Sequence, residues 1–188
     1  MLTCFTLTAA TSALIASGAA ADYTLTFLHT NDIHSRVESI NKYGSTCNAD
    51  GDVTMDEVLT VLPFQNTPST FFVSGATIVA ALENGVSKME EGAGRFPQVA
   101  GMSFTVNSSA EEGSRISNVM VSGSAIDLNK TYGVVSNNYL RNGEDGYKMF
   151  RDAENAYDYG PDLVDVTAEY IAKGGSNIAY TDGRIKVK

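Results

Sequence analysis

The alternation of apolar and polar residues divides the start of the chain into a strand, a loop and a helix. Residues 23–29, YTLTFLH, form an apolar run typical of a buried strand, whereas residues 35–53 are polar and predict a loop. Thr54-Met-Asp-Glu57 has the form of a capping box, in which the threonine and glutamate side chains bind each other's backbone amides. A helix is therefore expected to start there and to stop at Pro63. Its apolar face consists of Val58, Leu59 and Leu62.

The pattern after this helix predicts a mixed α/β (α+β) domain over residues 51–188. Apolar residues at i, i+4 and i+8 predict a helix that starts at Gly75, and Pro161 suits the first position of another helix. Residues 138–147 are polar and contain glycine, so they predict a loop. Strands are predicted at 70–74, 99–106, 116–121, 132–136 and 184–187.

The first 21 residues have the composition of a targeting segment. They contain no charged side chain and end in the small residues Ala19-Ala20-Ala21, which resemble a signal-peptidase site. We therefore predict a signal peptide over residues 1–21 and a secreted, extracellular protein. A membrane anchor is the alternative, but threonine, serine and glycine dilute the apolar stretch. Cys47 would then be the one cysteine of the mature chain: its partner is another chain or a lost segment, or it is a buried thiol.

The charge of the chain limits its partners. The net charge is −9 and the sequence pI is about 4.6, so a surface for nucleic acid is not expected. The sequence contains no basic amphipathic segment of the kind that binds a membrane surface. A small anionic ligand remains compatible with this charge, through a local cationic group or a metal ion. The sequence does not specify the oligomeric state.

Two side chains of metal-ligand type follow the first predicted strand. Asp32 and His34 stand two positions apart in LHTNDIHSR, and a strand with a period of two points both to one side. A carboxylate with an imidazole suits Zn²⁺, Mn²⁺ or iron. On composition alone, the alternative is an ordinary turn with two surface residues, because aspartate is a common turn former.

The longer context of this motif resembles a known family. LHTNDIHSR resembles the first motif of the secreted and periplasmic 5'-nucleotidases, which include apyrases and UDP-sugar hydrolases and are dinuclear metallophosphoesterases. The resemblance implies that Asp32 and His34 are metal ligands and that the cofactors are divalent ions such as Zn²⁺ or Mn²⁺. It also implies that residues 22–50 are a remnant of the N-terminal metallophosphoesterase domain and that residues 51–188 are the C-terminal, substrate-binding domain.

Two further segments resemble the nucleoside-binding part of that family. GDVTMDEVLTVLPFQNT (51–67) is similar to the segment that carries one aromatic wall of the nucleoside slot, here Phe64. YLRNGEDGY (139–147) is similar to the segment with the second wall and a ribose-binding aspartate, here Tyr139 and Asp145. The family usually has phenylalanine at the position of Tyr139. Spacing alone favours the alternative, in which both rings are core aromatics and Asp145 is a turn residue.

The resemblance breaks at STCNADGDVT (45–54), where the family would have most of its catalytic domain. An N-H-E motif, further histidines and an N-G-G-x-R segment are absent, and the chain has only two histidines. A full dinuclear site and a catalytic residue are therefore not expected in this chain. Three hypotheses follow: an internally deleted nucleotide phosphohydrolase, a module that binds a nucleoside or nucleotide without catalysis, or an inactive chain. In the third, the strand at 23–29 has lost its sheet neighbours and favours aggregation.

Overall fold

The larger of two sheets has five strands in the order β3-β1-β7-β2-β8. The protein is described here by a computed structural model, which defines residues 26–30, 53–174 and 181–188. β7 pairs in parallel with β1 and antiparallel with β2, so the sheet is mixed. The strands are β1 (Thr26–Thr30), β2 (Pro68–Ser74), β3 (Pro97–Ala100), β7 (Thr131–Asn137) and β8 (Glu154–Tyr157).

The second sheet has the order β6-β5-β4-β9. Its strands are β4 (Met102–Val106), β5 (Ile116–Val121), β6 (Ser124–Ala125) and β9 (Ile185–Val187). β3 and β4 are separated by Gly101, whose φ of 74° lies in the left-handed region that glycine reaches without steric cost. The single strand predicted at 99–106 is therefore two strands, one in each sheet.

Helix α2 (Gly75–Val86) joins the two sheets into one hydrophobic core. Its N-cap is Ser74, whose side chain accepts a hydrogen bond from the Thr77 amide. Ile78, Leu82 and Val86 are buried, as their helical spacing predicts, and they belong to the same core cluster as Phe71 of β2 and Phe104 of β4. A 3₁₀ turn, η1 (Met89–Glu91), follows the helix.

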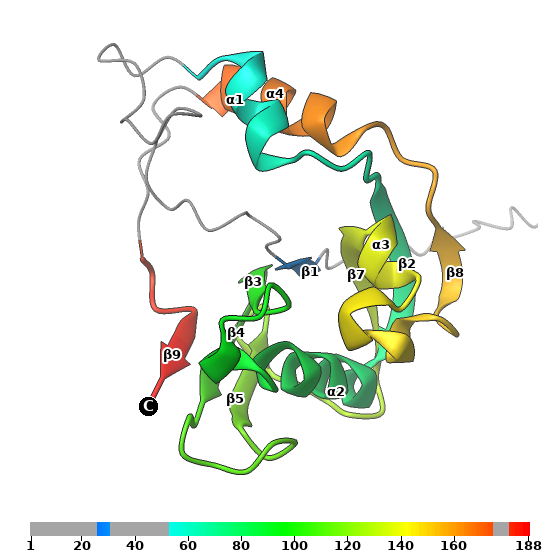
Figure 1. Cartoon of the computed structure of the whole chain (residues 1–188). Coiled ribbons are helices and arrows are strands. Elements are labelled where there is room, and N and C mark those ends of the chain that lie inside the picture. Colours follow the sequence, from blue (N-terminus) through cyan, green and yellow to red (C-terminus); the bar gives the residue numbers. More distant parts are fainter. Residues whose placement is uncertain (1–25, 31–52, 175–180) are drawn as a thin grey trace, which may run out of the picture.

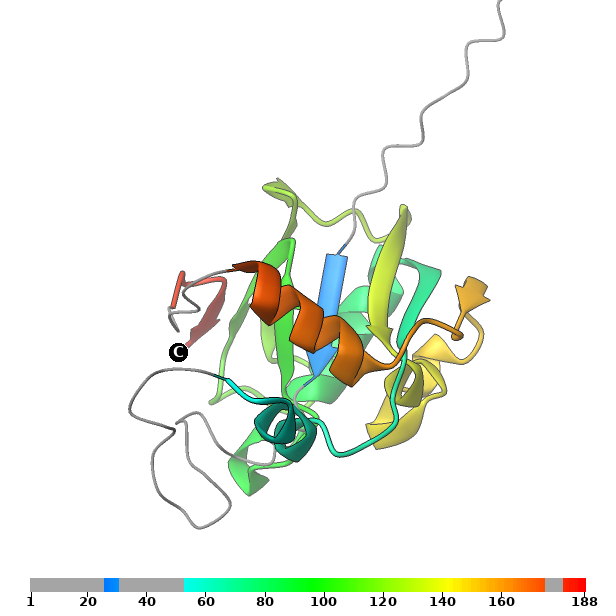
Figure 2. The same ribbon diagram turned by 90° about the horizontal axis from the view of Figure 1, so that it is seen from above.

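Two further helices, α1 (Met55–Val61) and α4 (Leu163–Gly174), pack against each other at one end of the molecule, away from α2 (Figure 1). Viewed from above, α4 lies across this end, beside α1 (Figure 2). Val58 of α1 and Val164 of α4 are buried. α4 starts two residues later than expected from Pro161, because the Asp162 side chain accepts the Val164 amide and starts the helix at that point.

The segment predicted to be a loop, residues 138–147, contains a short helix and a 3₁₀ turn. These are α3 (Asn138–Arg141) and η2 (Glu144–Gly146), and η3 (Lys148–Phe150) follows. The prediction was wrong because a local side-chain cap closes the first turn: the Asn137 side chain accepts the Leu140 amide at 2.9 Å. The two-residue strand β6 and the edge strand β8 were not predicted.

The expectation that the first strand lacks sheet neighbours is wrong. β1 lies between β3 and β7 in the first sheet and pairs with both. The ancestry of residues 22–50 in another domain stays a prediction, and residues 1–25 lie outside the described residues. Among the described residues, no helix has the combined length and apolar character that a membrane crossing needs.

Candidate nucleoside site

Tyr139 is presented to the surface by a short helix that is fixed to the core. Its neighbour Leu140 is 1% exposed and belongs to the core cluster, whereas Tyr139 itself is 44% exposed. Asn137, the last residue of β7, caps α3 and fixes the direction of the helix relative to the sheet. Tyr139 is therefore an outward-facing aromatic residue on a firmly placed element.

Asp145 lies in a turn whose backbone is left-handed at three positions. Gly143, Asp145 and Gly146 have φ values of 89°, 49° and 84°, and aspartate is one of the few other residues that tolerate this region. The Tyr139 hydroxyl donates to Asp145 Oδ1 at 3.4 Å. The hydroxyl of Tyr139, which the phenylalanine usual in the family lacks, thus contacts the Asp145 carboxylate.

Asn84 and Arg95 support this turn from beneath. The Asn84 amide donates to the Asp145 carbonyl at 3.1 Å. A Cβ placed on Gly146 would collide with the Asn84 side chain and lie 3.3 Å from an Arg95 guanidinium nitrogen. Glycine is therefore required at position 146 for space as well as for its positive φ.

Tyr147 connects the turn to the core. It is fully buried, its hydroxyl donates to the Arg95 carbonyl at 2.7 Å, and its ring stacks on Phe150 with centroids 5.6 Å apart. Burial raises the pKa of the Tyr147 phenol; the Arg95 charge lowers this pKa and the Asp145 charge raises it. The phenol therefore stays a hydrogen-bond donor.

Phe64 lies in the connection between α1 and β2 and is 49% exposed. The preceding helix has the predicted capping box: the Thr54 amide donates to Glu57 Oε2 at 2.7 Å, and the Glu57 amide to Thr54 Oγ1 at 3.4 Å. The Leu163 amide donates to the Asn66 carbonyl at 2.8 Å. The segment that carries Phe64 is therefore attached to the start of α4.

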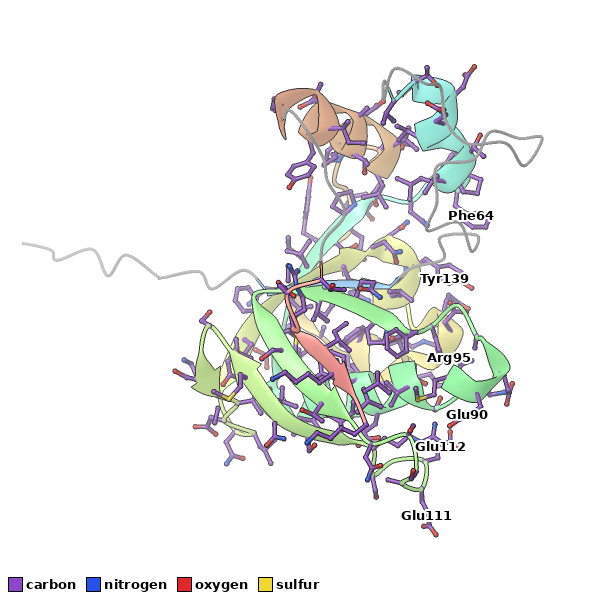
Figure 3. The ribbon with its side chains drawn as sticks, turned by 90° about the vertical axis from the view of Figure 1, so that its left-hand side faces the viewer. Phe64, Glu90, Arg95, Glu111, Glu112 and Tyr139 are labelled. Atoms are coloured by element: carbon purple, nitrogen blue, oxygen red, sulfur yellow. The ribbon has the colours of Figure 1, made fainter. Side chains whose placement is uncertain are left out.

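Two reciprocal hydrogen bonds place the Phe64 segment beside the Tyr139 helix. The Asn138 amide donates to the Thr67 carbonyl at 2.9 Å, and the Thr67 amide donates to Asn138 Oδ1 at 3.1 Å. Phe64 precedes one partner by three residues, and Tyr139 follows the other directly. Both rings lie on the same side of the molecule, Phe64 above Tyr139 (Figure 3). The alternative that both are core aromatics is wrong, because each ring is about half exposed. Their role as walls of a slot stays a prediction.

The surface beyond Tyr139 is charged. Arg95 follows next on the same side, and Glu90, Glu111 and Glu112 lie beyond it (Figure 3). The Arg115 guanidinium binds Glu90 with an N–O distance of 2.9 Å, and the pKa of Glu90 is lowered, first by a backbone hydrogen bond and then by Arg115. Two cations lie beside the Asp145 turn, Arg95 next to Gly146 and Arg151 next to Gly143. The carboxylates beyond Arg95 disfavour long polyanions.

The predicted metal ligands Asp32 and His34, as well as Cys47, lie outside the described residues. Within the described ranges, no group of three or more histidine, cysteine, aspartate or glutamate side chains is arranged to hold a metal ion. Asn84, Arg95 and Tyr147 were not singled out from the sequence, although Tyr147 closes the segment YLRNGEDGY; only the fold reveals that they support the turn.

Comparisons with known proteins agree with the resemblance. The family described as 5'-nucleotidase, C-terminal domain, matches residues 8–152. The trifunctional nucleotide phosphoesterase YfkN of Bacillus subtilis (strain 168) is 37% identical over 142 residues, which are 72% of this chain and 10% of that protein. Human 5'-nucleotidase is 29% identical over 144 residues, 72% of this chain and 25% of that protein.

A solved structure shares the fold. The 5'-nucleotidase precursor from Thermus thermophilus superimposes with a TM-score of 0.74 at 32% identity, covering 86% of this chain and 31% of that one. The chain therefore spans between a tenth and a third of the length of these relatives. On the family match and these similarities, the chain belongs to the 5'-nucleotidase C-terminal domain family.

Proposed function

We propose that this chain binds the nucleoside part of a nucleoside 5'-phosphate between Phe64 and Tyr139, with Asp145 as the acceptor for ribose hydroxyls. The observation that carries the proposal is the pair of hydrogen bonds between Thr67 and Asn138, which brings the two aromatic segments together. The names of the relatives support the ligand class, since 5'-nucleotidase describes the human protein and the Thermus protein.

The chemistry of the three side chains suits a nucleoside. Two half-exposed rings can stack on both faces of a base, and stacking of one base on an aromatic side chain contributes about 1–3 kcal/mol in single-strand binders. An ionised carboxylate accepts hydrogen bonds from two vicinal hydroxyls. The Tyr139 hydroxyl, at 3.4 Å from Asp145 Oδ1, holds one carboxylate oxygen and leaves the other for the ligand.

We propose binding without hydrolysis for this chain. Phosphate-ester hydrolysis belongs to the family by resemblance, but the sequence holds two histidines and lacks the N-H-E motif. Asp32 and His34 are then a marker of ancestry rather than a working centre. The composition of residues 1–21 supports a further proposal, namely that the protein is secreted.

Isothermal titration calorimetry with adenosine and with AMP tests the binding. Tyr139→Ala should weaken binding about 5- to 150-fold, the equivalent of 1–3 kcal/mol. Tyr139→Phe keeps the ring and removes the hydroxyl that contacts Asp145, so its effect should be smaller. Tyr159→Ala is the matched control, because Tyr159 is 84% exposed and belongs to neither wall. No heat of binding with the wild-type chain would reject the slot.

Phosphate release tests the absence of hydrolysis. The chain is incubated with AMP and added Zn²⁺ or Mn²⁺, and inorganic phosphate is measured. We expect no turnover above that of the metal ions alone. Turnover that is lost in Asp32→Ala would show that the chain assembles a metal centre and would overturn this part of the proposal.

A further inference from the structure

β1 connects β3 to the rest of the first sheet. It runs antiparallel to β3, with Phe27 opposite Ala100, and parallel to β7, with Phe27 opposite Val135. Among the described strands, β1 is the only one that pairs with β3. Without β1 the first sheet would divide into β3 on one side and β7-β2-β8 on the other, with two facing edges about 10 Å apart.

We call the space between β3 and β7, which β1 fills, the β3–β7 groove. The two strands that line this groove have features of strands in a sheet interior. β7, TYGVVSN, and β3, PQVA, contain no charged residue. Val134 and Val135 are 3% and 5% exposed, so both faces of β7 are covered, and Val99 of β3 is 4% exposed. A strand buried on both faces without charges is suited to pairing on both edges.

The edge strands β8, β6 and β9 have protective features that β7 lacks. β8 begins with Glu154, has a left-handed Asn155 with φ of 49° and pairs irregularly with β2. β6 has two residues, and β9 has three, including Lys186. Short length, charge and bulges are the devices that protect an edge strand from further pairing.

The outer edge of β3 is also protected. Pro97 has no amide hydrogen, and the Val99 carbonyl accepts the Arg184 guanidinium at 2.8 Å. The backbone N–H and C=O groups of successive residues point to opposite edges of a strand, so those of Pro97 and Val99 point to the same edge. β3 is therefore closed on one edge and open only toward the groove.

The segment that fills the groove is joined to the domain by a long connection. About two dozen residues separate β1 from α1, and an extended chain spans up to roughly 3.3–3.6 Å per residue. Connectivity alone therefore does not force β1 into this place. The sequence YTLTFLHT (23–30) has no charged residue, which suits a strand that pairs on both of its edges.

We propose that the groove between β3 and β7 is an acceptor site for an extended peptide, and that residues 26–30 of the same chain act as its complementing strand. The domain then folds because the N-terminal segment supplies a strand that the remainder of the chain lacks. This inference goes beyond the proposed nucleoside binding and does not depend on Phe64, Tyr139 or Asp145.

The test is cleavage of the connection in the folded full chain. A specific protease site is inserted between residues 45 and 46, and the purified chain is cut under native conditions. The N-terminal piece should co-elute with the remainder on size exclusion and separate from it in denaturant. A fluorescent synthetic peptide of residues 22–32 should then exchange into the cut protein and not into the uncut one. Separation of the pieces without denaturant, with the melting transition of the remainder unchanged, would overturn the proposal.

Two proline variants of the full chain give a second, independent test. Leu28→Pro removes a backbone donor from the middle of β1. It should abolish the cooperative melting transition or lower its midpoint by roughly 6–12 °C, the shift expected for an interior proline in a chain of this length. Glu112→Pro is the control, because residue 112 is the second residue of a turn closed by the Ser114 amide and the Glu111 carbonyl, with a left-handed Gly113 next to it. Equal melting midpoints for the two variants would contradict the proposal.

Discussion

The two walls of the candidate slot are built in different ways. Tyr139 stands on a helix whose next residue, Leu140, is 1% exposed, and the turn that follows ends at the fully buried Tyr147. Phe64 follows α1, in which Val58 is the only buried residue and Met55 and Leu59 are about half exposed. The Tyr139 wall is therefore attached to the core through its neighbours, and the Phe64 wall depends on the contact of α1 with α4.

From this difference we expect the proposed slot to have a preformed half and an adjustable half. Regions with few buried apolar residues open at lower free energy than the core does. The Tyr139 half should be present before a nucleoside arrives, whereas the Phe64 half should be ordered further when a base stacks on it. Changes to the first half should lower both global stability and affinity, and changes to the second half should lower mainly affinity.

Tyr147→Ala should have the largest effect. It removes a buried ring that stacks on Phe150 and the hydrogen bond to the Arg95 carbonyl. Truncation of a buried aromatic residue costs about 3–5 kcal/mol, and the turn with Asp145 should lose its support. Urea unfolding measures the free energy of unfolding, with the exposed Tyr159→Ala as the control. A loss below about 1 kcal/mol would show that the Tyr139 wall is not fixed to the core in this way.

Gly146→Ala should have the next largest effect. The new Cβ meets the Asn84 and Arg95 side chains at a φ of 84°, so the substitution combines crowding with backbone strain, together about 1–3 kcal/mol. Gly92→Ala separates the two causes, because Gly92 has a φ of 66° and nothing within 4 Å of its Cβ position. Equal losses of unfolding free energy for the two variants would mean that Asn84 and Arg95 do not constrain the turn.

Two helix caps compare the halves directly. Thr54→Ala removes the cap of α1 and should cost that helix about 1 kcal/mol, increasing hydrogen exchange of the α1 amides and weakening adenosine binding at most about 5-fold. Ser74→Ala removes the cap of the core helix α2 and should lower the main unfolding transition instead. Thr54→Ala should leave the midpoint of the main unfolding transition unchanged. An equal shift of this midpoint in both variants would show that α1 unfolds with the core.

The smallest effect should come from Asp182, which lies away from both walls. Hydrogen bonds from Arg184 lower the pKa of Asp182 to about 2. Because the folded pKa is below the unfolded one, the pair stabilises the fold above the usual aspartate pKa near 4, and this contribution is lost as pH falls through about 2. Wild type and Asp182→Asn should thus have slightly different melting temperatures at pH 6, and the difference should shrink as the pH is lowered toward 2. Their adenosine affinities should be the same at pH 6.

The sequence predicts the local parts of this fold better than their assembly. The capping box at Thr54 and the apolar spacing of α2 are local patterns, and both occur in the structure as predicted. The break at Gly101 was missed because residues 99–106 are apolar on both sides of it. β8 was missed because Glu154 and Asn155 are polar, as suits an edge strand.

The partners of β1 could not be predicted for a different reason. A period of two indicates a strand, but it does not indicate which strands lie beside it. The support of Asp145 by Asn84 and Arg95 is likewise a contact between distant segments, which spacing along the chain cannot reveal. The resemblance provided Phe64, Tyr139 and Asp145, and the fold adds the side chains that hold them.

The most direct measurement is the affinity for adenosine of four proteins: wild type, Phe64→Ala, Tyr139→Ala and the double variant. If both rings stack on one base, each single variant binds adenosine about 5- to 150-fold more weakly. The loss of binding free energy in the double variant is then smaller than the sum of the losses in the two single variants. Wild-type affinity in Phe64→Ala would contradict a slot between the two walls.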